Sequence, residues 1–470
     1  MKSINDDVWD GRKSTEERPL LDDVLEPPLV PIEKQWHRPR MTFLMIFLII
    51  HFISFGFSLS MTYLRMVDLF KRTGLDNTAA VAQATIFNGY LGAIKGSGTF
   101  LLSPVFGKIS DRIGRKPLFF VSLLSTAFDT SAYIVGEPMW IFFISKAVLG
   151  LTDSMYTTGM AAMIDVTPTH RRAFGFAMFG VGFGLSMIGW PALAGFVADK
   201  TSFNMVFYIS LGIDGLALIT LLLMPETNRN KVKRPIYFSD FVPLSNFTFL
   251  FRNFHTKFLA FILVILSFSL EGIMDSFSPW LKFKFPNQSN FMMGTISSVA
   301  GAGLMMSAPI THFILPRLGK KKSICMSIAT GTAGLVTLVF VTEWWQLYPL
   351  ILLRSLAFVS NPTLQAMLCA HYSPEEQAPL VGILISLKTI PSVIGPFVFP
   401  KIFSYFIEHD PKIPEIVFYI VGIMNSFILV CCVVYFIFVK SPKTKQITPK
   451  DAYASVVVES PTFRRESLMQ

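Results

Sequence analysis

Charged residues are scarce in this sequence: they make up 15% of its 470 residues, whereas an average soluble protein carries about 25%. Hydrophobic residues make up 52%, and the mean hydropathy is +0.51. A soluble globular domain could not bury this much apolar surface, but a protein that crosses a bilayer many times exposes it to lipid. The composition therefore predicts an all-α integral membrane protein.

Cysteine is also rare. Cys325, Cys369, Cys431 and Cys432 all lie in apolar segments and lack the spacing of metal ligands, so we expect neither a disulfide framework nor a metal site. No nucleophile–base spacing, phosphate-binding loop or cofactor motif stands out, which predicts that the chain is not an enzyme and needs no cofactor. The first forty residues lack the basic and apolar regions of a cleaved signal peptide.

The formal net charge of +10 would suit a nucleic-acid partner if the basic residues formed a stripe. They fall instead in short links between apolar runs, which is the pattern that orients helices in a membrane. We therefore expect a lipid bilayer around the chain and no nucleic acid among its partners.

Twelve apolar segments follow residues 1–40, and each is close to the twenty residues or so that a spanning helix needs. They lie at about 41–66, 82–109, 117–136, 139–164, 172–198, 203–224, 256–281, 291–316, 323–341, 345–370, 378–405 and 414–439. A basic polar loop at 225–255 separates six from six, which predicts two six-helix halves, 41–224 and 256–439. An even number of spans puts the tails, 1–40 and 440–470, on one side, and the basic links place that side in the cytosol.

The link between the second and third segments packs five charges into ten residues. It reads Gly107-Lys108-Ile109-Ser110-Asp111-Arg112-Ile113-Gly114-Arg115-Lys116. Glycine allows a sharp turn and close helix approach. Asp111 can lie at a helix end or accept hydrogen bonds from arginine, while the basic residues stay on the cytosolic side. The block predicts a tight charged hairpin between two spanning helices.

This block resembles the signature loop of the major facilitator superfamily, Gly-x-x-x-Asp-x-x-Gly-Arg-Lys. It matches at Gly107, Asp111, Gly114, Arg115 and Lys116. The resemblance implies twelve transmembrane helices in two six-helix pseudo-repeats, which alternate access to a central cavity. It also implies that Asp111, Arg115 and Lys116 hold a cytosolic gate shut in one state.

Further blocks are similar to the drug–proton antiporter branch of that family. Lys146 and Gly150 stand at the spacing of an Arg-x-x-x-Gly motif in the fourth helix, and Gly395-Pro396 is similar to an antiporter glycine–proline pair. Asn88-Gly89 and Leu270-Glu271-Gly272 resemble the hippocampus-abundant-transcript-like group, which looks like the tetracycline antiporters. The second half contains a degenerate copy of the signature loop at Leu318-Gly319-Lys320-Lys321-Lys322, in which Pro316 stands at the position that corresponds to Asp111.

Acidic residues inside the apolar segments are costly in lipid, so we expect them to line a cavity within the protein. Glu271 and Asp275 are four residues apart, so they share one face of the seventh helix. Two carboxylates this close cannot both be ionised cheaply, which predicts a proton-carrying site, with Asp153 as a third candidate. Alternatively, Asp275 faces lumenal water. Asp129 and Asp214 are either cavity residues or members of structural ion pairs.

Basic residues occupy the same apolar segments, and we expect them to line the substrate cavity. They are Lys95, Lys146, Arg354 and Lys388. Such a cavity could attract an organic anion. Two alternatives remain open: Lys146 pairs with Asp153, seven residues further along one helix face, and Lys388 extends its ammonium group to the membrane surface.

Three short sequence patterns concern glycosylation and the membrane in which the protein resides. Asn287-Gln288-Ser289 is a glycosylation sequon in an expected lumenal link. Two tail patterns resemble endosome–lysosome sorting signals that adaptors bind; they involve Glu16, Leu20 and Leu21 in the first tail, and Tyr453 and Val456 in the last. They favour a lysosomal or endosomal membrane, with the plasma membrane as the alternative.

Together these features predict a secondary active transporter that moves a small organic solute, either an organic anion or another metabolite, and couples it to protons by alternating access. The runner-up is an uncoupled facilitator. A third hypothesis is a transceptor or interaction protein that keeps the fold and transports nothing, although buried charges have little use in such a scaffold.

Overall fold

The computed structural model describes residues 38–167, 172–228, 254–369 and 374–438, which form helices joined by short turns. The first eight helices are α1 (Arg38–Arg72), α2 (Asn77–Ile113), α3 (Arg115–Val135), α4 (Trp140–Thr152), α5 (Met155–Val166), α6 (Arg172–Met187), α7 (Trp190–Lys200) and α8 (Phe203–Leu223). The later ones are α9 (Phe254–Lys284), α10 (Asn290–Val339), η4 (Trp344–Gln346), α11 (Leu347–Arg354), η5 (Ser355–Val359), α12 (Ser360–Cys369), α13 (Pro374–His409) and α14 (Ile416–Phe438).

Every expected apolar segment falls on these helices. Within the described ranges, nine helical stretches are long and apolar enough to cross a membrane on their own. Three expected segments are not among these nine: 82–109 lies in the continuous helix α2, 139–164 contains α4 and α5, and 345–370 contains α11, η5 and α12. Segment 172–198 is among the nine, although it contains both α6 and α7. The expected tails and most of the central loop lie outside the described residues.

Helix α10 contains two of the expected segments, and Gly319 separates them. Its backbone has φ +74° and ψ 162°, which is not helical. Gly114, between α2 and α3, has φ +110° and ψ 168°. Only glycine adopts such angles without strain. The degenerate signature loop of the second half therefore has a glycine turn like that of the first half, although it lacks the aspartate.

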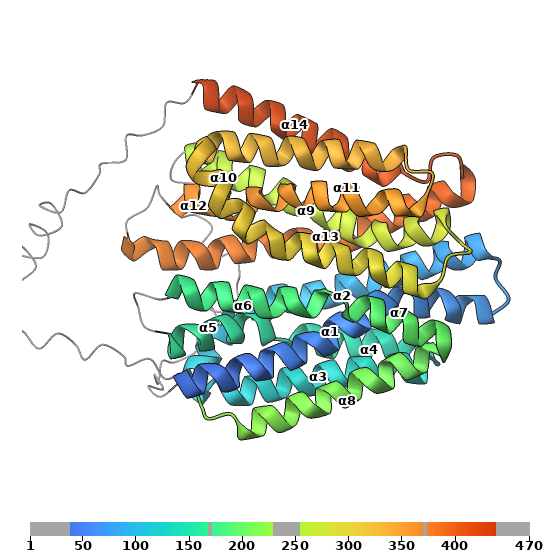
Figure 1. The fold of residues 1–470 in the computed structure, drawn as a ribbon, viewed down its shortest axis with the longest axis horizontal. Coiled ribbons are helices and arrows are strands. Elements are labelled where there is room, and N and C mark those ends of the chain that lie inside the picture. The colour runs from blue at the N-terminus through green and yellow to red at the C-terminus, as the bar shows by residue number, and fades with distance from the viewer. Residues whose placement is uncertain (1–37, 168–171, 229–253, 370–373, 439–470) are drawn as a thin grey trace, which may run out of the picture.

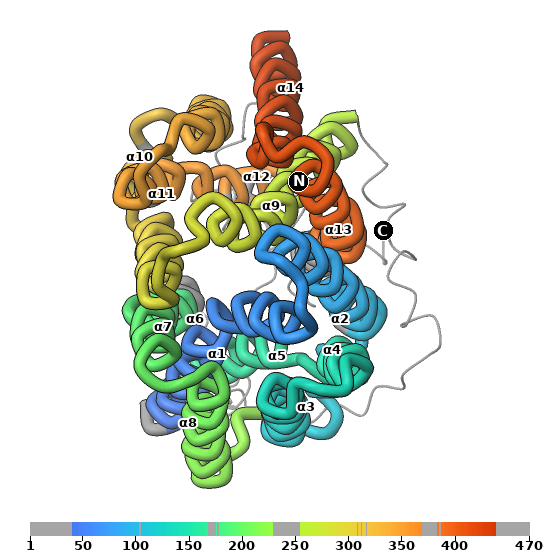
Figure 2. The backbone as a smooth tube through the Cα atoms, turned by 90° about the vertical axis from the view of Figure 1, so that its right-hand side faces the viewer, coloured from blue at the N-terminus to red at the C-terminus, as the bar shows by residue number. Residues whose placement is uncertain are grey.

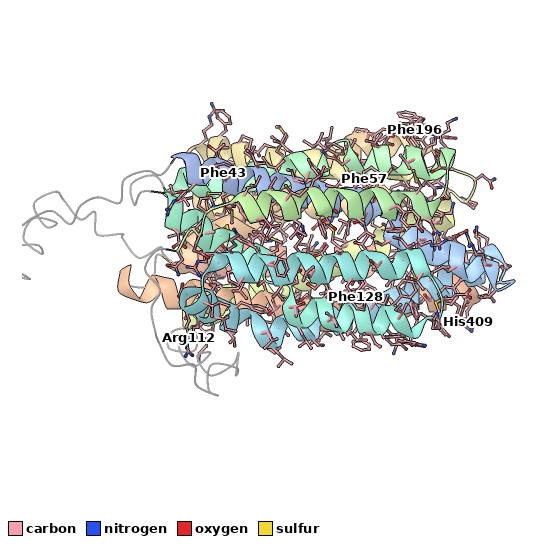
Figure 3. The ribbon with its side chains drawn as sticks, turned by 90° about the horizontal axis from the view of Figure 1, so that it is seen from below. Phe43, Phe57, Arg112, Phe128, Phe196 and His409 are labelled. Carbon is pink, nitrogen blue, oxygen red and sulfur yellow. The ribbon has the colours of Figure 1, made fainter. Side chains whose placement is uncertain are left out.

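The helices pack as two groups, which we call the N half (α1–α8) and the C half (α9–α14) (Figures 1 and 2). Figure 1 shows that α1 begins and α14 ends at the same end of the molecule, which we call the tail-side end. The opposite end, where α1 ends and α14 begins, is the far end. Large apolar side chains such as Phe43, Phe128 and Phe196 are 41–46% exposed on the outer surface (Figure 3), as lipid contact requires.

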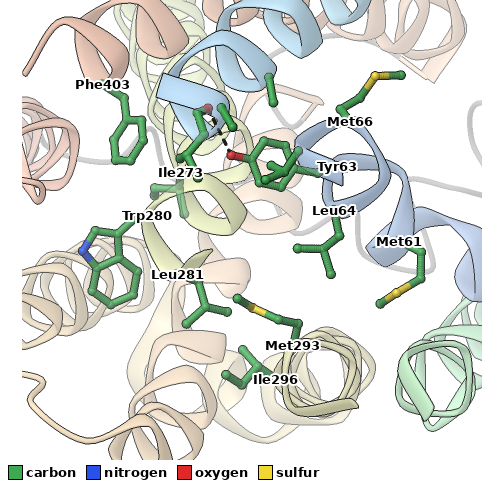
Figure 4. Close-up of a cluster of buried hydrophobic side chains, with 14 of the residues drawn as sticks. Met61, Tyr63, Leu64, Met66, Ile273, Trp280, Leu281, Met293, Ile296 and Phe403 are labelled. Carbon is green, nitrogen blue, oxygen red and sulfur yellow. Dashed lines mark hydrogen bonds between the residues drawn. The ribbon is translucent and has the colours of Figure 1, made fainter. Parts of the chain in front are cut away.

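Buried apolar side chains form three clusters in the described residues. One cluster lies toward the far end and contains residues of both halves, among them Tyr63 of α1, Ile273 of α9 and Met293 of α10 (Figure 4). The other two lie toward the tail-side end, one within the N half and one within the C half. The halves therefore share a core at the far end and keep separate cores at the tail-side end.

Close backbone approaches hold the halves together along two seams. In the first, α2 packs on α13, and a Cβ atom at Gly96 would collide with the carbonyl group of Ser392. In the second, α7 packs on α10, and a Cβ atom at Gly195 would collide with the carbonyl group of Asn290. Ser404 of α13 also donates a hydrogen bond to the carbonyl of Ala82 in α2, at 2.9 Å. Small residues are needed where helices approach this closely in a membrane.

Candidate functional site

The two acidic residues of α9 lie beside the first seam. Glu271 packs against Gly395 of α13, where a Cβ atom would lie 2.8 Å from the Cβ of Glu271. Asp275 follows one turn later on the same face, and its Oδ2 atom is buried without a hydrogen-bond partner in the described part of the chain. The opposite face of α9, which carries Ser269 and Ile273, points into the C half. The carboxylates thus lie on the side of α9 that packs against α13, beside the seam of α2 and α13.

Lys388 lies on the face of α13 that also carries Gly395. The two residues are seven positions apart, which corresponds to about 10 Å along the helix axis. The side chain of Lys388 is part-buried, and its ammonium group has no ion-pair partner within the described ranges. The structure therefore places two carboxylates and one cation on adjoining faces of α9 and α13.

Asp153 and Lys95 form a separate ion pair in the N half. The Lys95 ammonium lies 3.6 Å from Asp153 Oδ2, and the side chains remain 35% and 27% exposed. Asp153 also accepts a hydrogen bond from the backbone N–H of Met155 at 3.1 Å, at the start of α5. Gly98 and Gly150 let α2 and α4 approach closely beside this pair. The sequence predicted both residues as site candidates but not their pairing.

Lys146 does not pair with Asp153, which corrects that sequence-based alternative. Its ammonium group lies 2.6 Å from Asp129 Oδ2 on α3 and 5.2 Å from the centre of the Tyr133 ring. The physical reason is the end of α4 at Thr152: Asp153 has an extended backbone (φ −71°, ψ 101°), so the helical face that would align positions 146 and 153 does not continue. The Lys146–Asp129 pair is buried inside the N half.

Arg354 occupies a different place from the other predicted cavity residues. It lies at the end of α11 inside the C half, with its side chain against Gly334 of α10. The small cavity that it lines is formed by α9, α10, α14 and the segment from α11 to α12. The structure therefore does not bring Arg354 together with Glu271, Asp275 or Lys388.

The predicted gating loop is bound to the N half in this conformation. Arg115 is its centre: its guanidinium group lies 2.7 Å from Asp111 Oδ1 and 2.9 Å from Asp165 Oδ2, and it also contacts the Ser110 hydroxyl. Lys116 donates to the carbonyls of Leu222 and Met224 at the end of α8. Gly107 lies within the last turns of α2.

Sequence reasoning missed Glu226, which organises the same loop. Its carboxylate accepts hydrogen bonds from the backbone N–H groups of Arg115 (2.9 Å) and Lys116 (3.2 Å), the first residues of α3. A carboxylate at a helix N-terminus satisfies free N–H groups and complements the helix dipole. A side chain at Gly114 would occupy the position of this carboxylate. The available signal was an acidic residue directly after the sixth apolar segment.

A second missed residue, Asp199, joins the halves at the far end. Its carboxylate, at the end of α7, accepts hydrogen bonds from the backbone N–H groups of Asn290 and Phe291, both at 2.9 Å. It also accepts one from the Asn290 side chain at 2.8 Å. An N half residue thus satisfies the first turn of a C half helix, which sequence alone could not reveal because 91 positions separate them.

The remaining predictions fall in a turn, within α8 or outside the described residues. Asn287 is exposed in the turn between α9 and α10 at the far end. Asp214 lies 3.6 Å from His51 inside the N half. The sorting residues Glu16, Leu20, Leu21, Tyr453 and Val456 lie outside the described residues. In the described residues no group of three or more His, Cys, Asp or Glu side chains could hold a metal ion.

Comparison with known proteins supports the resemblance seen in the sequence. A family profile described as Major Facilitator Superfamily matches residues 46–396 and 287–469. The chain is 28% identical to the class E tetracycline resistance protein of Escherichia coli over 324 residues, which cover 67% of this chain and 78% of that protein. It is 21% identical to the hippocampus abundant transcript-like protein 1 of Homo sapiens over 329 residues, covering 68% and 64%.

Solved structures share the same arrangement of helices. The crystal structure of the nucleoside transporter NupG superposes with a TM-score of 0.68 at 14% identity, covering 84% of this chain and 100% of that one. The crystal structure of the human organic anion transporter MFSD10 (TETRAN) gives a TM-score of 0.62 at 16% identity, covering 84% and 99%. At sequence identities this low, the structural similarity shows a shared fold and not a shared substrate.

Proposed function

Because the chain belongs to the Major Facilitator Superfamily, and is thus a multi-pass membrane transporter and not an enzyme, we propose that it couples the transport of a small organic solute to the movement of protons. Glu271 and Asp275 are the proton-carrying residues of this proposal, and Lys388 and Lys95 bind acidic groups of the solute. The proposal is supported above all by the buried, unpartnered Asp275 oxygen beside Glu271 at the meeting of the two halves.

The separate cores support a transport cycle in which the tail-side end opens. The far end is closed by the shared core, the two seams and Asp199. A rigid rocking of the halves would exchange this state for one that is closed at the tail-side end. In that second state Asp111, which is 53% exposed here, gains a partner in the C half. Access of the solute from the cytosol follows if the basic links orient the chain as expected.

A carboxylate that carries a proton must lose that role when it becomes an amide. In proteoliposomes, Glu271→Gln should abolish solute uptake driven by a pH gradient, while solute exchange without a gradient continues. Tetracycline and a panel of organic anions serve as probes, since relatives of this chain include tetracycline resistance proteins and a fold neighbour is an organic anion transporter. An internal pH dye reports the protons.

Glu408→Gln, at an exposed position near the end of α13, is the matched control and should keep both activities. Unchanged proton dependence in Glu271→Gln would refute the coupling role. Flux that ignores the pH gradient in the wild type would identify an uncoupled facilitator instead, and solute binding without any flux would identify a transceptor.

We also propose residence in a lysosomal or endosomal membrane, with sorting adaptors as partners. The support is the pair of short tail signals described above.

A further inference from the structure

The C half contains a small internal cavity that the proposed transport function does not use. Its volume is about 60 Å³, and its walls come from α9, α10, α14 and the segment between α11 and α12. Arg354 contributes the charged part of the wall. No described side chain forms an ion pair with its guanidinium group, and the carboxylates of α9 lie on the opposite helix face.

The backbone of this segment turns several side chains toward the cavity. Ser355–Val359 forms the 3₁₀ helix η5 between α11 and α12. Side chains three positions apart are eclipsed in a 3₁₀ helix. Arg354, Ala357 and Ser360 consequently stand in one row, and all three line the cavity. A continuous α-helix would have spread the three side chains over about 120° of its surface.

Three neutral polar side chains in the cavity wall also lack partners. Ser269 Oγ, Asn361 Oδ1 and Asn425 Oδ1 are buried without a hydrogen bond in the described part of the chain. Ser269 is 2% exposed and Asn425 is 7% exposed. Buried polar groups are hydrogen-bonded in the great majority of proteins. Unpaired groups from α9, α12 and α14 that converge on one charged side chain therefore indicate a bound ligand.

Charge decides what this ligand is. Arginine stays protonated in proteins, and a guanidinium group inside a membrane span without a counter-ion carries a large desolvation penalty. Water would satisfy its N–H groups but would leave the charge uncompensated. An anion does both. The Asn361 and Asn425 amides can rotate to direct their NH₂ groups at it, and Ser269 can donate its hydroxyl hydrogen.

Size then limits the anion. A cavity needs about 10–15 Å³ in this measure to hold one water molecule, so about 60 Å³ admits a monatomic anion with a few water molecules and is too small for a solute of the size of tetracycline. We propose that the C half binds a chloride ion between Arg354, Ser269, Asn361 and Asn425. The site lies inside one half and is independent of the proposed proton coupling.

The test is binding of chloride to the purified full chain. Equilibrium dialysis with ³⁶Cl⁻ should show saturable binding. The melting temperature of the protein should rise as chloride or bromide replaces gluconate at constant ionic strength, because gluconate is too large for the cavity. Arg354→Met should abolish both effects. Arg317→Met, which removes an exposed arginine beside the Gly319 turn of α10, should retain both.

A charge-preserving variant keeps the test valid if Arg354→Met does not fold. Ser269→Ala removes one donor and should weaken chloride binding several-fold while leaving the guanidinium group in place. Absence of saturable ³⁶Cl⁻ binding to the wild type would overturn the proposal and leave a cavity that holds only water. Chloride binding that Arg354→Met leaves unchanged would overturn it as well.

Discussion

The buried Lys146–Asp129 pair provides the sharpest test of which membrane charges are structural. Its N–O distance is 2.6 Å, and the two side chains are 15% and 11% exposed. Asp129 Oδ1 also accepts a hydrogen bond from the Ser145 hydroxyl at 2.9 Å. The perturbation is removal of one partner at a time, Asp129→Asn and Lys146→Met, followed by the double variant Asp129→Leu/Lys146→Met.

The expected magnitudes follow from burial. Removing one partner of a buried pair leaves an uncompensated charge and costs about 3–5 kcal/mol, whereas replacing both partners with apolar residues is often close to neutral. We expect the low end, about 3 kcal/mol, because the ring of Tyr133 partly compensates Lys146 in Asp129→Asn, and Ser145 partly compensates Asp129 in Lys146→Met. At about 2 °C per kcal/mol, each single variant should melt about 6 °C below the wild type.

Thermal unfolding of purified protein in one detergent measures these differences, and solute exchange in proteoliposomes supplies the functional readout. The double variant should recover most of the lost stability and melt close to the wild type, and it should still exchange solute. Additive destabilisation, or a stable double variant that has lost exchange, would refute the structural assignment and return Lys146 to the solute path.

Two further predictions concern the ends of the molecule. Asp111→Ala should slow turnover several-fold without changing solute affinity, because Asp111 acts only when the tail-side end closes; counterflow rates measure this, and normal turnover would remove the gating role. Asp199→Ala removes the hydrogen-bond acceptor at the N-terminus of α10, which costs about 1 kcal/mol. This loss should raise the fraction of molecules that are open at the far end roughly fivefold. A single cysteine at Leu281 should then react about fivefold faster with an impermeant maleimide, and unchanged labelling would contradict this role.

Much of the fold could be predicted because the bilayer imposes a length and a hydrophobicity on each span. The same periodicity could not reveal where a span is interrupted. Asp153 and Ser154 look like helix interior in the sequence, yet α4 ends before them. Interruptions such as this one depend on tertiary contacts, here the hydrogen bond from the Ser154 backbone N–H to Ser122 of α3 at 2.9 Å.

The site was partly predictable for a related reason. Glu271 and Asp275 are four residues apart in a continuous helix, so their shared face followed from the sequence. The partners of Lys95 and Lys146 did not, because they come from other helices: Asp153 at 58 positions and Asp129 at 17. Helix spacing predicts contacts within a helix, whereas ion pairs between helices depend on packing.

Partner choice also separates the charges by their use in a transport cycle. A pair within one half, such as Lys146 with Asp129, moves as part of a rigid body and has the same energy in both states. It therefore cannot bias the equilibrium between them. Glu271, Asp275 and Lys388 have no ion-pair partner within the described ranges, so in the proposed cycle their surroundings change when the halves rock. Only such groups give a proton or a solute the differential affinity that drives alternation.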